Sequence, residues 1–353
     1  FDINDFDETL PEPWEWDLKR LVASIEIAGR SAGFAPARVR SQVLATSREY
    51  RAAMREFAAL GNLELWATRM DPETAAARWG GSFSPKGKAR AERRAAKAHS
   101  KDHMKALARL THRHEGALRI NSDPPLIVPV SEWPQLRGRL EEAESRVEKL
   151  IAAYARTLTG SAGALLDEYR FVDIARKVVG VGSVGTRALI VLFVGRDDGD
   201  PLFLQVKEAQ PSVLEPHLRA SRYRSHGRRV VEGQWLMQAS SDVFLGWLSA
   251  EGVDGVKRDF YVRQLWDWKL SALVEQMSAA DLAAYGGMCG WTLARAHART
   301  GDRVAMAAYM GRGDALDRAL ADFSRAYADQ NERDYEQFGA AADSGKITAE
   351  TGI

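Results

Sequence analysis

Cysteine is nearly absent from this chain, which has 353 residues and contains only Cys289. A single cysteine excludes an internal disulfide framework and is typical of proteins from a reducing cytosol. Long apolar runs are absent as well. None approaches the roughly 18 residues that a membrane-spanning helix needs, and no signal peptide opens the chain. The sequence therefore predicts a cytoplasmic protein with no membrane partner.

An excess of charge of one sign is also missing. The chain has 49 basic and 48 acidic residues, a net charge of +1, so no overall field favours nucleic acid or an anionic membrane. The most basic stretch, residues 86–109, contains no Phe, Tyr or Trp, whereas grooves for single strands interleave aromatic residues. We expect a solvated helix face there and no nucleic-acid partner.

His99 and His103 lie four residues apart on this helix, but without acidic or thiol ligands at ordered spacing they do not predict a zinc site.

A glycine-rich stretch at residues 178–209 is the most informative part of the chain; it reads VVGVGSVGTRALIVLFVGRDDGDPLFLQVKEA. Gly180, Gly182 and Gly185 form a G-x-G-x-x-G run, which alone is a weak signal. In dinucleotide-binding units a helix follows the third glycine and holds the pyrophosphate. Here an apolar, β-branched strand follows, then a turn and a second strand. This order disfavours an NAD-dependent enzyme with a Rossmann fold.

The order of strand, glycine loop and two further strands resembles the ATP-covering loop of the protein kinases. Lys207, in the second strand after the loop, occupies the place of the kinase lysine that contacts the phosphates. Glycines allow backbone amides to approach phosphate oxygens, and a lysine on the neighbouring strand adds a point charge. The alternative is an ordinary β-meander, with glycines at its turns and a lysine at its surface.

Acidic and apolar residues alternate at the start of the chain, FDINDFDE. We interpret this run as a short strand whose acidic end suits a hard divalent cation, with a solvated acidic turn as the alternative. Because the run is already strand-like at Phe1, we expect the chain to be a fragment or a processed form. Asp17 follows in the first turn of a helix, where a carboxylate favours the positive end of the helix dipole.

Hydrophobic periodicity predicts helices at residues 36–60, 136–158, 281–299 and 314–338. LELWATRM is expected to be extended, and ALLDEYRFVDIARK to form a helix before the glycine loop. Residues 178–265 are β-rich, with one helix over HGRRVVEGQWLMQAS and strands over DVFLGWLS and RDFYVRQL. The fold class is therefore α+β, with a five-stranded sheet and one inserted helix between two helical regions.

Seven segments together resemble the bacterial domain of unknown function family 2252: FDINDFDETLPEPWEWDLKRL, VVGVGSVGTR, LFLQVKEA, HGRRVVEGQW, YVRQLWDWK, LARAHARTGD and YADQNERDY. The resemblance covers nearly the whole chain. It implies a two-lobed protein-kinase-like fold, similar to the aminoglycoside phosphotransferases, in circularly permuted order. The small antiparallel-sheet lobe is inserted in a helical lobe.

The resemblance also divides the chain into domains. Residues 1–170 would be the helical large-lobe part with a metal-binding turn at its start, and 171–265 the β-rich nucleotide-binding small lobe. Residues 266–340 would supply the remaining large-lobe helices, and 341–353 a frayed tail.

The resemblance further implies roles for single residues. Asp5 would bind Mg²⁺ against the phosphates of ATP, assisted by Asp7, and Asp5 and Lys207 would be the catalytic residues. Glu232 would orient Lys207, with Glu215 as the second choice.

Further roles concern the cofactor. Gly180, Gly182, Ser183 and Gly185 would cover the phosphates. Gln264 and Leu265, leading to Trp266, would form the hinge against the adenine. Asp17 would brace the catalytic loop as a structural residue.

These residues predict an ATP- and Mg²⁺-dependent phosphotransferase, or a nucleotidyl-transferring variant, acting on a small-molecule or protein acceptor. The resemblance implies that family members carry a Gly-Asp-x-His-x-x-Asn segment ahead of the present Phe1, similar to the catalytic loop of the phosphotransferases. HARTGD at 297–302 is not followed by an asparagine at the spacing of that loop. We therefore expect this chain to lack the general base and to bind nucleotide weakly. The alternative is a catalytically inactive, nucleotide-binding pseudokinase or scaffolding module.

Overall fold

The computed structural model describes residues 1–99, 103–136, 140–178, 185–252, 254–265 and 272–348. Two compact units are present. Unit 1 comprises Phe1–Ile3, Glu12–Ala91 and Ala272–Ile353, and unit 2 comprises Asn4–Pro11 and Glu92–Ser271. The described residues form 12 α-helices and two antiparallel sheets, which confirms the α+β class. Within this part of the chain, no helix combines the length and the apolar character needed to cross a membrane.

Unit 1 is helical. Its main helices are α1 (Trp14–Ser31), α2 (Pro36–Ala58), α3 (Asn62–Ala67), α4 (Pro72–Trp79), α10 (Ala279–Thr300), α11 (Arg303–Met310) and α12 (Ala315–Asp343). The helix α5 (Pro85–His99) begins in this unit, and η4 (Val274–Gln276) is a 3-10 turn before α10. Helices α2 and α10 approach so closely that a Cβ on Gly290 would lie 2.7 Å from the carbonyl oxygen of Thr46. Small residues on α10 therefore let these two helices form the centre of the unit.

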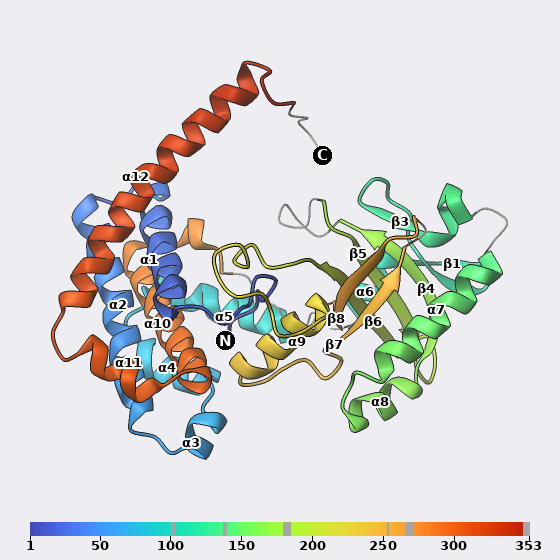
Figure 1. The fold of residues 1–353 in the computed structure, drawn as a ribbon, viewed down its shortest axis with the longest axis horizontal. Coiled ribbons are helices and arrows are strands. Elements are labelled where there is room, and N and C mark those ends of the chain that lie inside the picture. Colours follow the sequence, from blue (N-terminus) through green and yellow to red (C-terminus); the bar gives the residue numbers. More distant parts are fainter. Residues whose placement is uncertain (100–102, 137–139, 179–184, 253, 266–271, 349–353) are drawn as a thin grey trace. The chain divides into compact units, whose positions relative to one another are not determined.

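The last helix of unit 1 is long and only partly packed. Leu320 and Ala321 are buried against the other helices, whereas Tyr335 and Phe338 are exposed. Figure 1 shows this C-terminal half of α12, in red, projecting past the other helices of the unit. The helix continues to Asp343, beyond residue 340, after which we expected fraying.

Unit 2 is built on a sheet with the strand order β3-β4-β5-β6-β8-β7. Its strands are β3 (Ile127–Pro129), β4 (Arg170–Lys177), β5 (Ala188–Val194), β6 (Pro201–Ala209), β7 (Gly246–Glu251) and β8 (Lys257–Gln264). A separate hairpin joins β1 (Thr111–His114) to β2 (Ala117–Ile120), and η1 (Val130–Glu132) and η2 (Pro134–Leu136) are 3-10 turns. The helices are α6 (His103–Leu110), α7 (Leu140–Ala155), α8 (Gly160–Asp167) and α9 (His226–Met237).

The central strands of this sheet are covered on both faces. In β5, Ile190 and Leu192 belong to one apolar cluster, and Val191 and Phe193 belong to another. A strand that is buried on both faces is a continuous apolar run, which explains why ALIVLFV does not alternate with polar residues. Helix α9 lies along β7 and β8 (Figure 1). The sheet therefore gives rigid positions to the polar side chains at the ends of β6 and β8.

Three local predictions were wrong. Residues 170–177 form β4 and not a helix, because β3 and β5 satisfy the backbone of this segment on both edges. LELWATRM is not extended, since α3 covers Asn62–Ala67. Residues 1–8 form no strand, and a turn at Asp7 takes its place. The sheet also has a sixth strand, because β3 and β4 join the strands of the glycine-rich region.

Candidate functional site

Lys207 and Asp7 form an ion pair within unit 2. The Nζ atom of Lys207 donates to Oδ2 of Asp7 at 2.8 Å, although the two residues are 200 positions apart. The side chain of Lys207 is 16% exposed and that of Asp7 is 36% exposed, so the pair lies at the edge of the unit and is not sealed inside it. The other carboxylate oxygen of Asp7, Oδ1, is buried and makes no hydrogen bond with any described residue. The lysine and one of the two predicted metal-binding carboxylates are thus brought together.

Tyr261 completes the surroundings of the lysine. It lies opposite Lys207 in the β6–β8 register, and Nζ of Lys207 stands 5.3 Å from the centre of its ring. Burial raises the pKa of the Tyr261 hydroxyl well above its usual range, and the negative charges of Asp7 and Asp5 add to this effect against the opposing charge of Arg263. Tyr261 is therefore uncharged. Its ring lies beside the ammonium of Lys207 and favours the contact of that ammonium with the Asp7 carboxylate.

Asp5 and Asp7 belong to one tight turn. Oδ1 of Asp5 accepts the backbone N–H of Asp7 at 3.2 Å, and Asp5 itself is exposed. Phe6 between them is buried. The buried ring anchors the turn, while the Asp5 carboxylate is exposed and the Asp7 carboxylate is partly buried. Asp5 is the more accessible of the two predicted metal ligands, and Asp7 is the one that contacts Lys207.

The described end of the glycine run lies next to the lysine in the sheet. Ala188, the first residue of β5, pairs with Lys207 on β6. Gly185, shortly before it, has φ +85°, a left-handed conformation that glycine adopts without strain. The predicted phosphate-covering residues Gly180, Gly182 and Ser183 lie outside the described residues.

The two carboxylates predicted to orient Lys207 have other neighbours. Glu232, on α9, accepts from Nε of Arg228 at 3.0 Å. Glu215 lies 4.0 Å from Nδ1 of His226, and both of these facing atoms are buried without a hydrogen-bond partner among the described residues. The structure thus places Asp7, and neither glutamate, against Lys207.

The predicted hinge residues end the last strand. The backbone N–H of Gln264 donates to the carboxylate of Asp242, and the N–H of Leu265 donates to the carbonyl of Phe203 at 3.0 Å. Leu265 is buried in the apolar cluster on one face of the sheet. Trp266, which follows, lies outside the described residues.

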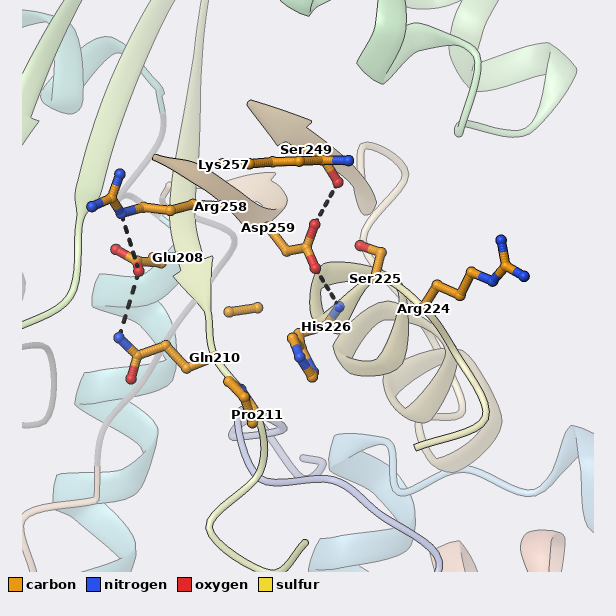
Figure 2. A pocket seen from close by; sticks show the side chains of 11 residues that line it. Glu208, Gln210, Pro211, Arg224, Ser225, His226, Ser249, Lys257, Arg258 and Asp259 are labelled. Carbon is orange, nitrogen blue, oxygen red and sulfur yellow. Dashed lines mark hydrogen bonds and ion pairs between the residues drawn. The ribbon is translucent and has the colours of Figure 1, made fainter. Parts of the chain in front are cut away.

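A polar pocket opens where β6 ends and α9 begins, as Figure 2 shows. It encloses about 440 Å³ and is lined by Glu208, Ala209, Gln210, Pro211, Arg224, Ser225, His226, Ser249, Lys257, Arg258 and Asp259. The carboxylate of Asp259 accepts from the backbone N–H of His226 at 2.9 Å and from the hydroxyl of Ser249. This carboxylate fixes the first turn of α9 to β8. Neither Lys207 nor Asp7 lines the pocket, so it is distinct from the ion-pair site.

In unit 1, the aspartate that was predicted to be structural has a histidine partner. Oδ2 of Asp17 lies 3.2 Å from Nε2 of the buried His297, whose Nδ1 lies 2.8 Å from the hydroxyl of Tyr50. Burial acts to raise the pKa of Asp17, but the hydrogen bond and charge of His297 outweigh it, so the pKa of Asp17 is lowered. The contact between Asp17 and His297 therefore links α1 to α10. Burial and the neighbouring Asp17 raise the pKa of Glu12 to about 7.

A family model for uncharacterised proteins conserved in bacteria, domain of unknown function 2252, matches residues 1–341. The chain belongs to this family. Searches of curated proteins and of solved structures found no significant match. The family carries no assigned activity, so the chemistry of the site has to be argued from the side chains of this chain.

The side chains near Lys207 could supply only a few ligands to a metal ion. In the part of the chain that the structure describes, no three His, Cys, Asp or Glu side chains are grouped as a metal would require. Asp5 and Asp7 alone suit Mg²⁺, which keeps several waters and takes one or two carboxylates together with phosphate oxygens.

The motifs did not single out two residues of the site, Tyr261 and Arg229. The strand alternation of RDFYVRQL places Tyr261 on one face, but only the pairing of β6 with β8 shows that this face carries Lys207. Arg229, in HGRRVVEGQ, has the sequence context of a solvated helix residue and is only 2% exposed.

Proposed function

We propose that this chain is a kinase-like phosphotransferase that uses ATP and Mg²⁺, with the nucleotide phosphates bound in unit 2 at Lys207. The observation that carries the proposal is the 2.8 Å contact between Lys207 and Asp7, next to the strand that follows the glycine run. A lysine beside a carboxylate and a glycine-rich loop is the set of groups with which kinases neutralise and position phosphates.

Each group has a defined part in this proposal. Lys207 would leave Asp7 to bind a phosphate oxygen, because a phosphate offers more negative charge than one carboxylate. Asp7 and Asp5 would hold Mg²⁺, which neutralises the charge of the phosphates when it is bound. Tyr261 stays neutral, because burial raises its pKa, and its ring lies beside the ammonium. Positioning and charge neutralisation account for most of the rate in phosphoryl transfer, so these groups suit the chemistry.

The first test is thermal unfolding of the chain with ATP, with MgCl₂ and with both. Mg·ATP at a hundred times its dissociation constant should stabilise the protein by roughly 2.7 kcal/mol. Lys207→Ala should abolish the shift. Lys257→Ala should retain it, because Lys257 is an exposed lysine on the adjacent strand. Asp5→Asn should remove the dependence on magnesium. The proposal fails if Mg·ATP gives no shift, or if both lysine variants retain it equally.

A second candidate function is nucleotide binding without catalysis, as in a pseudokinase or scaffolding module. It is favoured by Asp302 in HARTGD, whose Oδ1 accepts from the backbone N–H groups of Val304 and Ala305 and caps α11. His297 in the same motif is engaged by Asp17 and Tyr50. Neither side chain is free to act as a base. Release of ADP with a phosphorylated acceptor, or of pyrophosphate with an adenylylated acceptor, would support transfer, and nucleotide binding without either pair of products would support the second function.

A further inference from the structure

Arg229 is a buried cation without a carboxylate in hydrogen-bond contact. Arg229 is 2% exposed, and its Nη1 and Nη2 atoms donate to three backbone carbonyls. These belong to Thr9 at 2.7 Å and to Asp7 and Gln210 at 2.8 Å. A buried charge normally has a direct ionic partner, because removing it from water is unfavourable. Arg229 instead donates its hydrogen bonds to two backbone segments. One is the turn that carries Asp7, and the other is the end of β6.

The positions of both segments matter for the ion pair. Gln210 directly follows β6, three residues after Lys207, and Asp7 carries the carboxylate that Lys207 contacts. One guanidinium therefore ties the lysine strand and the carboxylate turn to the same helix, α9. The planar fork of arginine suits this arrangement because it presents several N–H groups in fixed directions.

Other contacts hold the same turn against the segment that follows β6 and against α9. The Ser212 hydroxyl donates to the carbonyl of Glu8 at 2.9 Å, and the Glu8 carboxylate accepts from the N–H of Val213 at 2.8 Å. A Cβ on Gly233 would lie 2.5 Å from the side chain of Thr9, so the helix and the turn are in contact. At Asp7 itself, the backbone N–H donates to Asp5, the carboxylate accepts from Lys207, and the carbonyl accepts from Arg229.

We propose that Arg229 is the positioning residue of the Lys207–Asp7 pair, and that it acts on Lys207 only through Asp7. The proposal deepens the proposed function, since it names the residue that keeps the phosphate-binding lysine and the metal-binding carboxylate in register. Glu232, on the same helix, has no such part, because it is paired with Arg228.

The test measures the acetylation rate of Lys207 by mass spectrometry, with N-hydroxysulfosuccinimide acetate and no nucleotide. An ammonium held by a carboxylate reacts slowly, so Asp7→Asn should raise the rate about five-fold, as expected for a partly exposed ion pair. Arg229→Gln should raise it to the same level, and Arg229→Lys to an intermediate one. Arg228→Gln is the matched control on the same helix and should leave the rate unchanged. Lys257 serves as the internal reference.

The double variant Arg229→Gln with Asp7→Asn decides how Arg229 acts. If Arg229 works through Asp7, the double variant reacts at the rate of Asp7→Asn alone. A further increase, or an unchanged rate in Arg229→Gln, overturns the proposal, as does an unchanged rate in Asp7→Asn. Should Arg229→Gln unfold the unit, its cooperative thermal transition is lost, and Arg229→Lys then decides by the same criteria. Because no nucleotide is present, this result is independent of whether Mg·ATP binds.

Discussion

At the scale of single residues, unit 1 contains a carboxylate whose proton is held more tightly than usual. Glu12 lies beside Asp17, whose own charge is stabilised by His297. Burial first, and the charge of Asp17 second, raise the pKa of Glu12 to about 7, while Arg20 acts in the opposite direction. The pKa values of these two neighbouring carboxyl groups thus shift in opposite directions, because Asp17 is hydrogen-bonded to His297 and Glu12 is raised by burial and by the charge of Asp17.

This difference predicts how stability depends on pH. The folded pKa of Glu12 lies above its ordinary value, so the folded state binds more protons and stability falls as pH rises from about 4.5 to about 7. Glu12→Gln should relieve this loss, stabilising the protein at pH 8 relative to pH 5 by on the order of 1 kcal/mol after solvent screening. Glu15→Gln, in the first turn of α1, is the control. Denaturant unfolding at both pH values measures the difference, and an equal effect of Glu12→Gln at pH 5 and pH 8 would contradict the assignment.

At the scale of elements, α9 connects the parts of the candidate site. Asp259 on β8 fixes its first turn, Arg229 on its inner face holds the turn of Asp7, and Arg228 pairs with Glu232 at its outer side. The helix sits very close to the sheet, because a Cβ on Gly227 would lie 2.1 Å from the carbonyl oxygen of Phe260. A displacement of α9 would therefore move Arg229 and the carboxylate that it positions.

Gly227→Ala tests this close packing. Because the clash is with backbone and no flexible side chain can yield, the variant should be destabilised by about 2–3 kcal/mol. Gly339→Ala in α12 is the matched control. No atom lies within 4 Å of its added Cβ, so alanine should stabilise that helix by up to about 1 kcal/mol. Chemical denaturation of the two variants gives both values, and a neutral Gly227→Ala would mean that α9 is not locked against β8.

At the scale of the whole molecule, each unit has its own core. The cluster around Met54 and Trp291 lies in unit 1, and the two clusters on the faces of β5 lie in unit 2. Separate cores allow the units to open with different free energies. The candidate nucleotide residues of the described chain, including Lys207 and Asp7, belong to unit 2.

Core truncations should therefore act locally. Met54→Ala in unit 1 and Ile190→Ala in unit 2 remove side chains with 0% exposure, and each should cost about 2–5 kcal/mol. Hydrogen exchange followed by mass spectrometry should show faster exchange mainly in the unit that carries the change. Equal acceleration in both units for both variants would show that the two cores unfold as one.

The amino-acid sequence by itself determined the features that depend on neighbours along the chain. Apolar spacing placed α2, α10 and α12, and the order of glycine run and strand placed Lys207 on β6. The motifs also identified the family, which the match over residues 1–341 confirms. These features are local because periodicity and turn chemistry are set by residues a few positions apart.

The tertiary structure decided what depends on distant pairing. The segment of β4 carries apolar residues that also fit a helix, and only its pairing with β3 and β5 made it a strand. The partner of Lys207 was expected on α9, but Asp7, 200 positions away, occupies that place. Arg229 had the context of a solvated residue, and its burial depends on which segments fold against α9. The charged residues of a short segment do not indicate which residues they will pair with. An ion pair depends on which side chains are close together in the folded chain and not on their spacing along the sequence.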